Sequence, residues 1–476
     1  MSRIRVPGQD GERSVSMAVP HRVPKAMPSR VPLVGSAVRI RRDPLGFVQQ
    51  IRRYGDVATF KLGPRTAYVV NHPDLIRQML VTDAEKFHKG VMFQKAQVLA
   101  RNGLFTSEGD FHARQRRLIQ PAVHASEIAG YTRTMGDHVE GLVTAWADGD
   151  VVRMDEVTLP LALGIVARVL FSTDLDPEAA AEVQETLPVL LRGLGQRALA
   201  PFDFLDRLPT PTNRAFERAL PRFQAVVYRM IRQHRLDLGH HPDLLTSLLR
   251  VVDADTGAAM TDDQVYDEVT SMIIAGSETT AAAMSWAAYL LATHPAAQRA
   301  VQDEVDDVLR GRPVRYEDLG RLRYTHRVVK ETLRLYPTTW MLMRRPLVDV
   351  DLGGYRLPAD AMVLFSIFAL HRDPALFPDP EQFDPDRWLP ARAGTIPPHA
   401  YLPFGAGPRG CIGAPFTHTE ASVFLATLAQ RHTLVPVSDE PARIVTTLIP
   451  MPGPIALAVR SRTEPPVSTS PEAVTG

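Results

Sequence analysis

The order of apolar and polar residues predicts strands near the start of the chain, followed by helices. From Gly55, the segment GDVATFKLGPRTAYVVNHP alternates apolar and polar positions on both sides of Gly63-Pro64. A period of two around a Gly-Pro turn is typical of a β-hairpin. The next residues, HPDLIRQMLV, place apolar side chains at helical spacing, and we expect Asn71 to cap that helix.

The longest helical pattern runs from Thr261 to Thr293 and stops before His294-Pro295. Thr261 precedes acidic residues, as at a capped helix start. At ~1.5 Å per residue this helix would be about 50 Å long, and its middle is apolar on all sides, which predicts burial. A second strand cluster, VDLGGYRLPADAMVLFS, is expected at 350–366. The predicted fold class is therefore mainly α with a small β-rich portion.

The composition is that of one large globular domain with a polar tail at each end. The chain has 476 residues, of which 45% are hydrophobic and 22% charged, and its 40 prolines must interrupt it often. Residues 1–30 are polar, basic and proline-dotted, which predicts a flexible N-terminal tail. Residues 461–476 are rich in Ser, Thr and Pro, which predicts a disordered C-terminal tail. Residues 31–460 show neither repeat nor linker, so we expect a single domain.

Charge and cysteine content exclude several classes of function. Lys+Arg number 54 and Asp+Glu 53, so the chain lacks the basic excess expected for a nucleic-acid partner or an anionic membrane. Residues 1–30 contain no apolar run of membrane-spanning or signal-peptide length, so we expect no membrane span and a cytoplasmic protein. Cys411 is the one cysteine, which excludes an internal disulfide and every zinc or iron–sulfur site that needs two thiols of this chain.

The candidate chemistry centres on Cys411. In PFGAGPRGCIGAPFTHTEASVFLATLA, which starts at Pro403, four glycines surround the cysteine and an amphipathic helix follows it. Because glycine has no Cβ, a glycine-rich backbone can pass very close to a flat ligand. The free N–H groups and the dipole at a helix start favour the thiolate form of a cysteine. A single cysteine is more often a small buried apolar residue. Because an inert cysteine needs neither the loop nor the helix start, we favour a thiolate ligand.

The pattern Phe404-x-x-Gly407-x-Arg409-x-Cys411-x-Gly413 resembles the haem-binding signature of the cytochrome P450 monooxygenases, with every position filled. The resemblance extends over about 31–460. Further segments in the family's order are Ala275-Gly276-Ser277-Glu278-Thr279-Thr280, which resembles the oxygen-activation motif, Glu331 and Arg334 of the E-x-x-R helix, Arg387 in FDPDRW, and His112 with Arg116 in GDFHARQRRLIQPA. Two departures from the common pattern, Val123 and Thr417, are expected to lie away from the chemistry.

The resemblance implies a cytochrome P450 fold with haem b between the long central helix and the helix after the Cys loop. Cys411 would be the axial ligand of the haem iron. The other implied cofactor-binding residues are Arg116, His112, Arg409 and Arg344 at the propionates, and Phe404, Ala275 and Gly276 near the ring. From the residues alone, His112 and Arg116 could equally be a solvated basic face or a docking surface for an electron donor.

Thr279 and Glu278 are the predicted catalytic residues. The Thr279 hydroxyl can bond back to the Ala275 carbonyl and open a groove in the helix. Burying Glu278 is costly unless it supplies protons or meets a partner. Gly276 is expected to remove bulk where the helix passes over the haem. The string alone could also be a helix N-cap or a small-residue helix contact.

Glu331, Arg334 and Arg387 are predicted to form a structural network behind the haem that holds the Cys loop. The first two residues, three apart on a helix, could by themselves be an ordinary solvated ion pair. The family's Glu-Arg-Arg arrangement is what favours the buried network.

The implied activity is that of an oxidoreductase, a monooxygenase that hydroxylates an apolar small molecule with O2 and two electrons. Neither tail is long enough for a reductase module, so NAD(P)H electrons are expected to arrive through a separate ferredoxin and ferredoxin reductase. We expect a monomer. One alternative is a peroxide-driven peroxygenase, against which the Glu278-Thr279 pair argues. The other is a haem-binding protein without turnover.

The segments expected to line a pocket are mostly apolar and carry no cluster of acids; they are 88–105, 187–205, 338–343 and 446–452. They favour a neutral hydrocarbon skeleton, with Phe93, Phe105, Trp340 and Met341 as suitable walls, although apolar residues are more often plain core. Residues 86–122 also resemble bacterial terpenoid-oxidising members, the pentalenene oxygenases among them. We expect a terpenoid such as a cyclic sesquiterpene, oxidised once or stepwise to the aldehyde. Fatty-acid or macrolide hydroxylation is the alternative.

Overall fold

The computed structural model describes residues 22–462 apart from 29–34, 172–176, 199, 201, 237–242, 251, 253–256, 258 and 447–448. The helices are α1 (Ala37–Arg42), α2 (Pro44–Arg52), α3 (Pro73–Arg77), α4 (Val91–Ala100), α5 (Gly109–Ile119), α6 (Ala125–Thr144), α7 (Met154–Phe171), α8 (Pro177–Ala198), α9 (Pro211–Leu236), α10 (Leu244–Arg250), α11 (Asp262–Thr293), α12 (Pro295–Leu309), α13 (Tyr316–Leu319), α14 (Arg323–Leu335), α15 (Ile367–Leu370), α16 (Pro390–Ala393) and α17 (Ala414–Arg431). The strands are β1 (Lys25–Ala26), β2 (Val57–Leu62), β3 (Arg65–Val70), β4 (Phe87–His88), β5 (Val151–Arg153), β6 (Leu342–Pro346), β7 (Val350–Leu352), β8 (Tyr355–Leu357), β9 (Met362–Phe365), β10 (His432–Pro436), β11 (Ile444–Thr446), β12 (Pro450–Pro452) and β13 (Ala456–Ser461).

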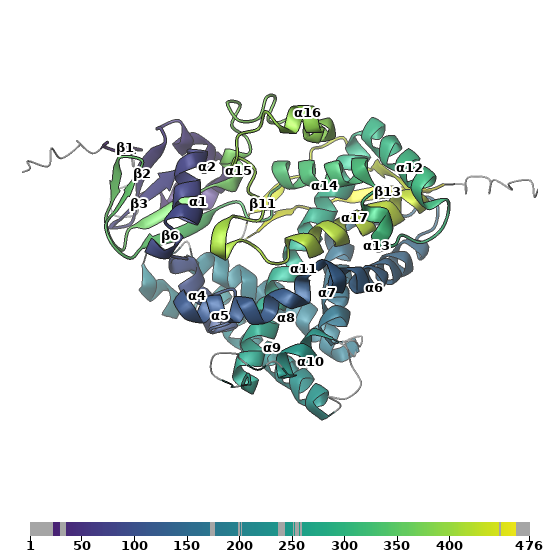
Figure 1. Ribbon diagram of the computed structural model, residues 1–476, viewed down its shortest axis with the longest axis horizontal. Helices are drawn as coiled ribbons and strands as arrows, with labels where there is room; N and C mark the ends of the chain where they lie inside the picture. Colours follow the sequence, from purple (N-terminus) through teal and green to yellow (C-terminus); the bar gives the residue numbers. More distant parts are fainter. Residues whose placement is uncertain are drawn as a thin grey trace, which may run out of the picture.

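The larger sheet and most of the helices occupy different parts of the molecule (Figure 1). Strands β1, β2, β3 and β6 gather with α1 and α2 at the left of the view. Helices make up most of the remainder, and β13 of the three-stranded sheet β10-β13-β5 lies among them at the right. In that view α11 runs through the helical part, with α14 and α17 above it and α8, α9 and α10 below. The prediction of a mainly helical protein with a small β-rich portion is therefore confirmed.

The predicted hairpin organises the larger sheet, whose strand order is β1-β2-β3-β9-β6-β4. β2 and β3 pair antiparallel, with Val57 opposite Val70 and Leu62 opposite Arg65. β3 lies parallel to β9, which in turn pairs antiparallel with β6. A hairpin near the start of the chain thus supports β6, the strand that carries Arg344 to the site.

The long helix is the central support of the site. The Thr261 hydroxyl accepts the Gln264 N–H, and the Gln264 side chain accepts the Thr261 N–H, so the predicted cap is a full capping box. Most of α11 is buried. Near its end the Trp286 indole N–H donates to the Pro450 carbonyl, and its ring stacks on Tyr336 with centroids 3.7 Å apart.

Two local predictions are wrong. The cap of α3 is His72, whose Nδ1 accepts the Asp74 N–H, while the Asn71 amide donates instead to the Gly55 carbonyl at 2.7 Å. Part of the predicted N-terminal tail is also ordered, because Lys25 and Ala26 pair in parallel with β2. A short segment beside a sheet edge can use the edge's free backbone groups, which no local pattern reveals.

The remaining tail predictions mostly lie outside the described residues, which begin at 22 and end at 462. Ser461, the first residue of the predicted C-terminal tail, still belongs to β13 and pairs with His432.

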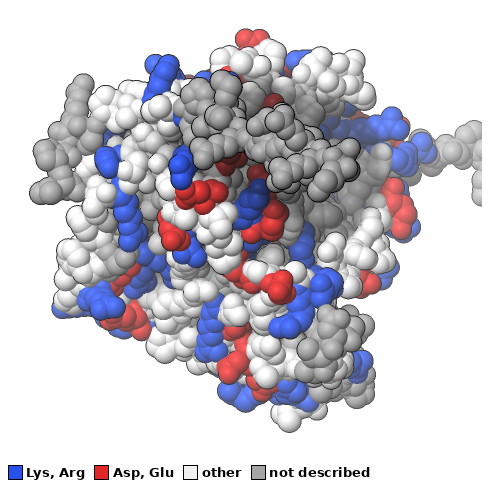
Figure 2. All heavy atoms as spheres, turned by 60° about the vertical axis from the view of Figure 1, so that its left-hand side comes forward, with Lys and Arg blue, Asp and Glu red and all other residues white. Residues whose placement is uncertain are grey.

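The surface carries both signs of charge. On the face drawn in Figure 2, Lys and Arg side chains lie among Asp and Glu side chains, as the nearly equal totals lead one to expect. Among the described helices, none has the length together with the apolar character needed to cross a bilayer.

Candidate active site

A cavity of about 370 Å³ lies between α11, the Cys loop, β6 and the α4–α5 region. Each of the pocket segments expected from the sequence contributes to its wall. The four bulky residues named as suitable walls, Phe93, Phe105, Trp340 and Met341, all line it. Phe93 and Phe105 pack together, with ring centroids 5.1 Å apart. The cavity is mostly apolar, and its charged groups come mainly from four basic side chains and a histidine described below.

The loop before Cys411, here called the Cys loop, needs glycine because of its own backbone conformation and its contacts with other parts of the protein. Gly405 and Gly407 have φ values of +67° and +71°, where a side chain is strained. A Cβ on Gly407 would lie 2.0 Å from the Leu80 carbonyl oxygen. The close approach that the glycines allow at Gly407 is therefore to the chain's own backbone. The Cys411 N–H donates to the Phe404 carbonyl at 2.9 Å and closes the loop.

The Cys411 side chain is accessible from the cavity and lines it. Burial among protein groups raises the pKa of its thiol. The backbone N–H groups of Gly413 and Ala414, which donate towards it, and the nearby Arg116 act in the opposite direction. The helix start thus supplies the expected donors, but burial outweighs them. A bound metal cation would reverse this balance, because a coordinating thiol loses its proton.

Arginine side chains from three distant segments meet at the cavity. Arg116 of α5 donates to the Gly410 carbonyl of the Cys loop at 2.7 Å. Arg409 donates to the Ala84 carbonyl at 2.9 Å and lies 3.2 Å from a Glu108 carboxylate oxygen. Arg344 of β6 is buried, and burial together with Arg409 lowers its pKa to about 10.

His112 faces the same region in its neutral form. Burial, followed by the charge of Lys89, lowers the pKa of His112 to about 3. Its Nδ1 lies 3.3 Å from the Ser107 hydroxyl and 3.4 Å from Lys89 Nζ. A hydrogen bond to the Pro408 backbone acts against this lowering of the His112 pKa. Nε of Arg409 is buried without a hydrogen-bond partner in the described part of the chain.

Lys89 is a site residue that the sequence reasoning missed. It is buried, lines the cavity, and donates to the carbonyls of Leu104 and Phe105 at 2.8 and 2.9 Å. Burial lowers its pKa to about 7. The only signal was a lysine within a segment already expected to line the pocket.

These basic groups fit a ligand that carries carboxylates at one edge. Lys89, Arg116, Arg344 and Arg409 line the cavity together with His112, whereas Glu268 is the one acidic lining residue within the described ranges. Several buried cations that share one carboxylate, Glu108 beside Arg409, are costly, and the unpartnered Nε–H of Arg409 needs an acceptor. A flat dicarboxylate with an iron ion for the Cys411 sulfur meets both needs.

On α11 the cavity is lined by Ala275, Gly276 and Thr279. The Thr279 hydroxyl donates to the Ala275 carbonyl at 2.5 Å, as predicted. Gly276 has a further reason that was not predicted, because its Cβ would lie 3.0 Å from a Val166 methyl group of α7. Its small size therefore allows α7 to pack against α11.

Glu278 is buried and does not itself line the cavity. Burial raises its pKa to about 7, and Arg192 of α8 acts in the opposite direction. Although the two residues are adjacent, the Thr279 hydroxyl faces the cavity, whereas the Glu278 carboxyl group is buried outside the cavity wall. An acid with a pKa near neutrality can both give and accept a proton under ordinary conditions.

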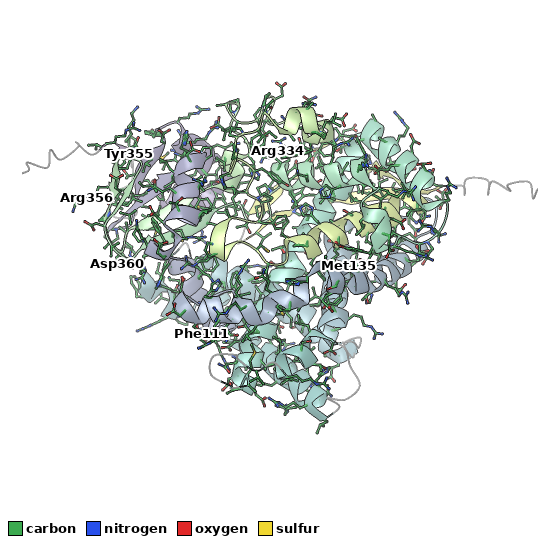
Figure 3. The ribbon with its side chains drawn as sticks, viewed as in Figure 1. Phe111, Met135, Arg334, Tyr355, Arg356 and Asp360 are labelled. Carbon is green, nitrogen blue, oxygen red and sulfur yellow. The ribbon has the colours of Figure 1, made fainter. Side chains whose placement is uncertain are left out.

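Glu331, Arg334 and Arg387 lie together and are almost completely buried (Figure 3 labels Arg334). Arg334 donates twice to the Glu331 carboxylate, at 3.0 and 2.9 Å, and Arg387 donates to it at 3.2 Å. Trp388, which the sequence reasoning did not single out, adds an indole N–H at 2.9 Å. Glu331 and Arg334 are therefore the core of a buried network and not an ion pair on a solvated helix face.

Two further expectations need correction. Val123 and Thr417 were expected to lie away from the chemistry, yet both line the cavity. Their positions follow from where the α5–α6 junction and the start of α17 meet the Cys loop, which is a tertiary contact.

The sequence matches the cytochrome P450 family over residues 25–457. The chain belongs to this family. It is 41% identical over 436 residues to the cyclooctatin synthase of Streptomyces melanosporofaciens, covering 91% of this chain and 95% of that protein. It is 40% identical over 435 residues to that organism's cyclooctat-9-en-7-ol 5-monooxygenase, with coverages of 91% and 95%. The pentalenene oxygenase of Streptomyces avermitilis is 36% identical over 426 residues, with coverages of 89% and 94%.

Among solved structures, the chain is similar to the cytochrome P450DA heme domain, with a TM-score of 0.84 at 27% identity. The match covers 94% of this chain and 99% of that one. The predicted P450 fold is confirmed, and the chain is a P450 monooxygenase. The cofactor of this P450 is haem b, which works with O2 and with electrons from redox partners.

Proposed function

We propose that this P450 hydroxylates a cyclic terpenoid, such as a cyclic sesquiterpene, with Cys411 as the axial ligand of its haem iron. The observation that carries the proposal is the single thiol of the chain, accessible from a mostly apolar cavity that is also lined by Thr279. When bound, a thiolate-ligated haem supplies the oxidising power for O–O cleavage and attack on an unactivated C–H bond.

The basic residues at the cavity have the chemistry needed to hold the cofactor. Arg116, Arg344 and Arg409 would pair with the two propionates, with His112 as a neutral donor. Lys89 joins this set. Phe404, Ala275 and Gly276 line the same cavity and would contact the ring.

Thr279 and Glu278 are proposed to deliver protons. The Thr279 hydroxyl faces the cavity and already donates to the Ala275 carbonyl, so its lone pairs remain open to water or O2. Glu278 is buried beside it with a pKa of about 7, which suits a group that takes protons from the α8 side and returns them to the hydroxyl. Glu331, Arg334 and Arg387 are proposed to be structural.

The apolar wall supports a hydrocarbon skeleton as substrate. Burying such a skeleton yields roughly 25 cal/mol per Å² but gives few orienting hydrogen bonds, so its shape must fix which carbon reacts. The named relatives, including the pentalenene oxygenase, support a terpenoid. Repeated oxidation of one carbon, from alcohol to aldehyde, is part of the proposal, because the first product keeps almost the same shape.

The electrons are proposed to come from NAD(P)H through a ferredoxin reductase and a ferredoxin. The protein is proposed to act in the cytoplasm, where these donors occur, and as a monomer, because one chain supplies every residue assigned to the site.

Two measurements on the purified haem protein test the proposal. Product that depends on NADPH and a surrogate ferredoxin system supports a monooxygenase, whereas product with peroxide alone, or none, contradicts it. Titration with sesquiterpenes, fatty acids and macrolides should give a low- to high-spin shift with the sesquiterpenes. A shift with only the other two classes would overturn the terpenoid assignment and leave the monooxygenase in place.

A further inference from the structure

The ammonium group of Lys89 has an acceptor for each of its three N–H groups. It donates to the carbonyls of Leu104 and Phe105 at 2.8 and 2.9 Å, and Nδ1 of His112 lies 3.4 Å away. Lys89 is 5% exposed, and a buried ammonium group is costly unless its donors are satisfied. Lys89 therefore adds its charge to the basic groups around the cavity, while its hydrogen bonds serve the chain itself.

These bonds hold the loop between α4 and α5. The two carbonyls that Lys89 binds belong to the peptide groups on either side of the Phe105 Cα atom. Peptide groups are planar, so fixing both of them fixes the backbone dihedral angles of Phe105 and the direction of its Cα–Cβ bond. On the other side of the loop, a carboxyl oxygen of Glu268 in α11 accepts the Leu104 N–H at 2.8 Å. Lys89 thus directs the Phe105 side chain.

Phe105 is one half of an aromatic wall of the cavity, and Phe93 is the other half. The two rings have centroids 5.1 Å apart, and both residues line the cavity. Nζ of Lys89 also lies 5.8 Å from the centroid of the Phe93 ring. The next residue, Gly90, directly precedes α4, the helix that carries Phe93. Lys89 therefore joins the two segments that carry the aromatic wall.

The position of the aromatic wall matters because an apolar substrate offers few hydrogen bonds for its orientation. The fit of the substrate against the wall then determines which carbon points to the part of the cavity that Thr279 and Cys411 line. Misplacement by 1 Å is enough to change a rate by about 10²-fold. A small movement of the wall therefore changes which carbon reacts.

We propose that Lys89 is a positioning residue, which fixes the Phe93–Phe105 wall and thereby selects the carbon of the substrate that is oxidised. The inference rests on the proposed function, since it takes the substrate to be apolar and Cys411 to be the axial ligand. It adds to that function the group that orients the substrate. Because Lys89 acts through the wall and not on the reacting atoms, a change at Lys89 should redistribute products more than it slows turnover.

The hold of Lys89 on the loop depends on its charge. The charged or titratable groups that face it are Glu108, His112, Glu268, Arg344 and Arg409. Burial lowers the pKa of Lys89 to about 7, together with the two arginines and against the two carboxyl groups. Loss of the proton removes one N–H and the charge that strengthens the other two bonds. We therefore expect a more selective product distribution below pH 7 than above it.

The test compares product ratios at pH 6 and pH 8, on either side of that pKa. It uses the purified haem protein, a surrogate ferredoxin system, and cedrane or patchoulane as substrate. A ratio of products does not depend on how fast electrons arrive. The parent protein should be at least about threefold more selective at pH 6 than at pH 8.

Two substitutions of Lys89 give opposite expectations. Lys89→Arg keeps its charge at both pH values, so its product ratio should not change between them. Lys89→Met should give a less selective ratio at both, with turnover within about threefold of the parent value. A purely structural role would lower stability or haem content without producing this dependence on pH.

Two further variants are controls. Glu268→Gln removes the other nearby group that titrates in this range, with a pKa of about 8, and keeps an acceptor for the Leu104 N–H. It should retain the change across pH 7. Lys86→Met removes an ammonium group three residues earlier that is 44% exposed and pairs with Asp83. It should match the parent protein at both pH values.

A parent ratio that is the same at both pH values, or a change with pH that Lys89→Arg retains, would overturn the inference and leave the proposed function intact. If Lys89→Met gives no haem protein, the parent and Lys89→Arg profiles decide the matter without it. If the sesquiterpenes give no product while lauric acid is hydroxylated, the terpenoid assignment falls. The ratio of hydroxylated positions on lauric acid then tests Lys89 in the same way.

Discussion

The backbone N–H of Leu402 donates a 2.9 Å hydrogen bond to Nε2 of His371. The other ring nitrogen of His371 lies 3.2 Å from the Arg334 carbonyl, and Arg334 itself donates to the His371 carbonyl at 2.9 Å. Because Leu402 begins the approach to the Cys loop, one neutral imidazole joins that loop to the buried Glu331 network. With Nε2 accepting, Nδ1 must carry the proton, and a second proton would remove the bond to Leu402.

This arrangement predicts a loss of stability in acid. Burial lowers the pKa of His371 to about 3, from an ordinary value of 6.5. Between these two pH values His371 is protonated in the unfolded chain but not in the folded chain. Its contribution to the free energy of unfolding is therefore fully present above pH 6.5 and falls as the pH drops towards 3. For one such group the slope is roughly 1.4 kcal/mol per pH unit. Urea unfolding between pH 4 and 7 measures it.

His371→Gln should be less stable than the parent protein at pH 7, with a dependence on pH that is flatter by about that slope. His72→Gln, which changes an exposed cap residue, is the control and should keep the parent slope. Parallel profiles for the parent and His371→Gln would show that His371 does not cause the acid sensitivity.

Removing Glu331 should prevent normal folding instead of slowing catalysis. Arg334 and Arg387 would be left buried without their carboxylate, at a cost of about 3–5 kcal/mol. We expect Glu331→Ala to give low yields of haem-free or misfolded protein. Glu185→Ala is the control, because that carboxylate and its partner Arg222 are both exposed. Haem-replete Glu331→Ala with normal melting would contradict the structural role.

Cys411→Ser should lose the red-shifted Soret band that reduced, thiolate-ligated haem shows with carbon monoxide. The chain has no second cysteine to replace Cys411. The spectrum of the carbon monoxide complex is the measurement. Retention of the band in the serine variant would remove Cys411 as the axial ligand.

Thr279→Ala should separate electron use from product formation. NADPH consumption should continue while product falls by roughly 10²–10⁴-fold and hydrogen peroxide accumulates, because the hydroxyl that faces the cavity is gone. Ser277→Ala is a close control: Ser277 makes the same bond to the carbonyl four residues earlier, at 2.7 Å, but is not part of the cavity wall. Equal coupling in the two variants would take Thr279 out of the mechanism.

Features encoded by local spacing were predictable from the sequence. The hairpin around Gly63-Pro64 and the capped start of α11 at Thr261 follow from alternation, turn chemistry and a capping pattern. The residues around Cys411 were equally predictable, because a sequence motif fixes both their identity and their order. In each case a few neighbouring residues determine the structure.

Features that depend on distant contacts were not predictable. Lys89 becomes a buried site residue because its ammonium group meets the carbonyls of Leu104 and Phe105, fifteen and sixteen residues away. The close packing of Gly276 depends on a methyl group of Val166, which lies in another helix. The pairing of β1 likewise depends on the edge of β2, and the sequence of residues 22–28 does not by itself predict a strand.

The gathering of Lys89, Arg116, Arg344 and Arg409 around one cavity joins the folding of this protein to its cofactor supply. Like charges held close in a low-dielectric interior repel, and Glu108 beside Arg409 is a single carboxylate among them, so we expect the folded chain to be less stable when no dicarboxylate lies between them. A ligand that binds only the folded form adds RT ln(1 + [L]/Kd) to stability, about 4 kcal/mol when it exceeds its Kd a thousandfold. We therefore expect the folded fraction of this protein to rise with the supply of haem.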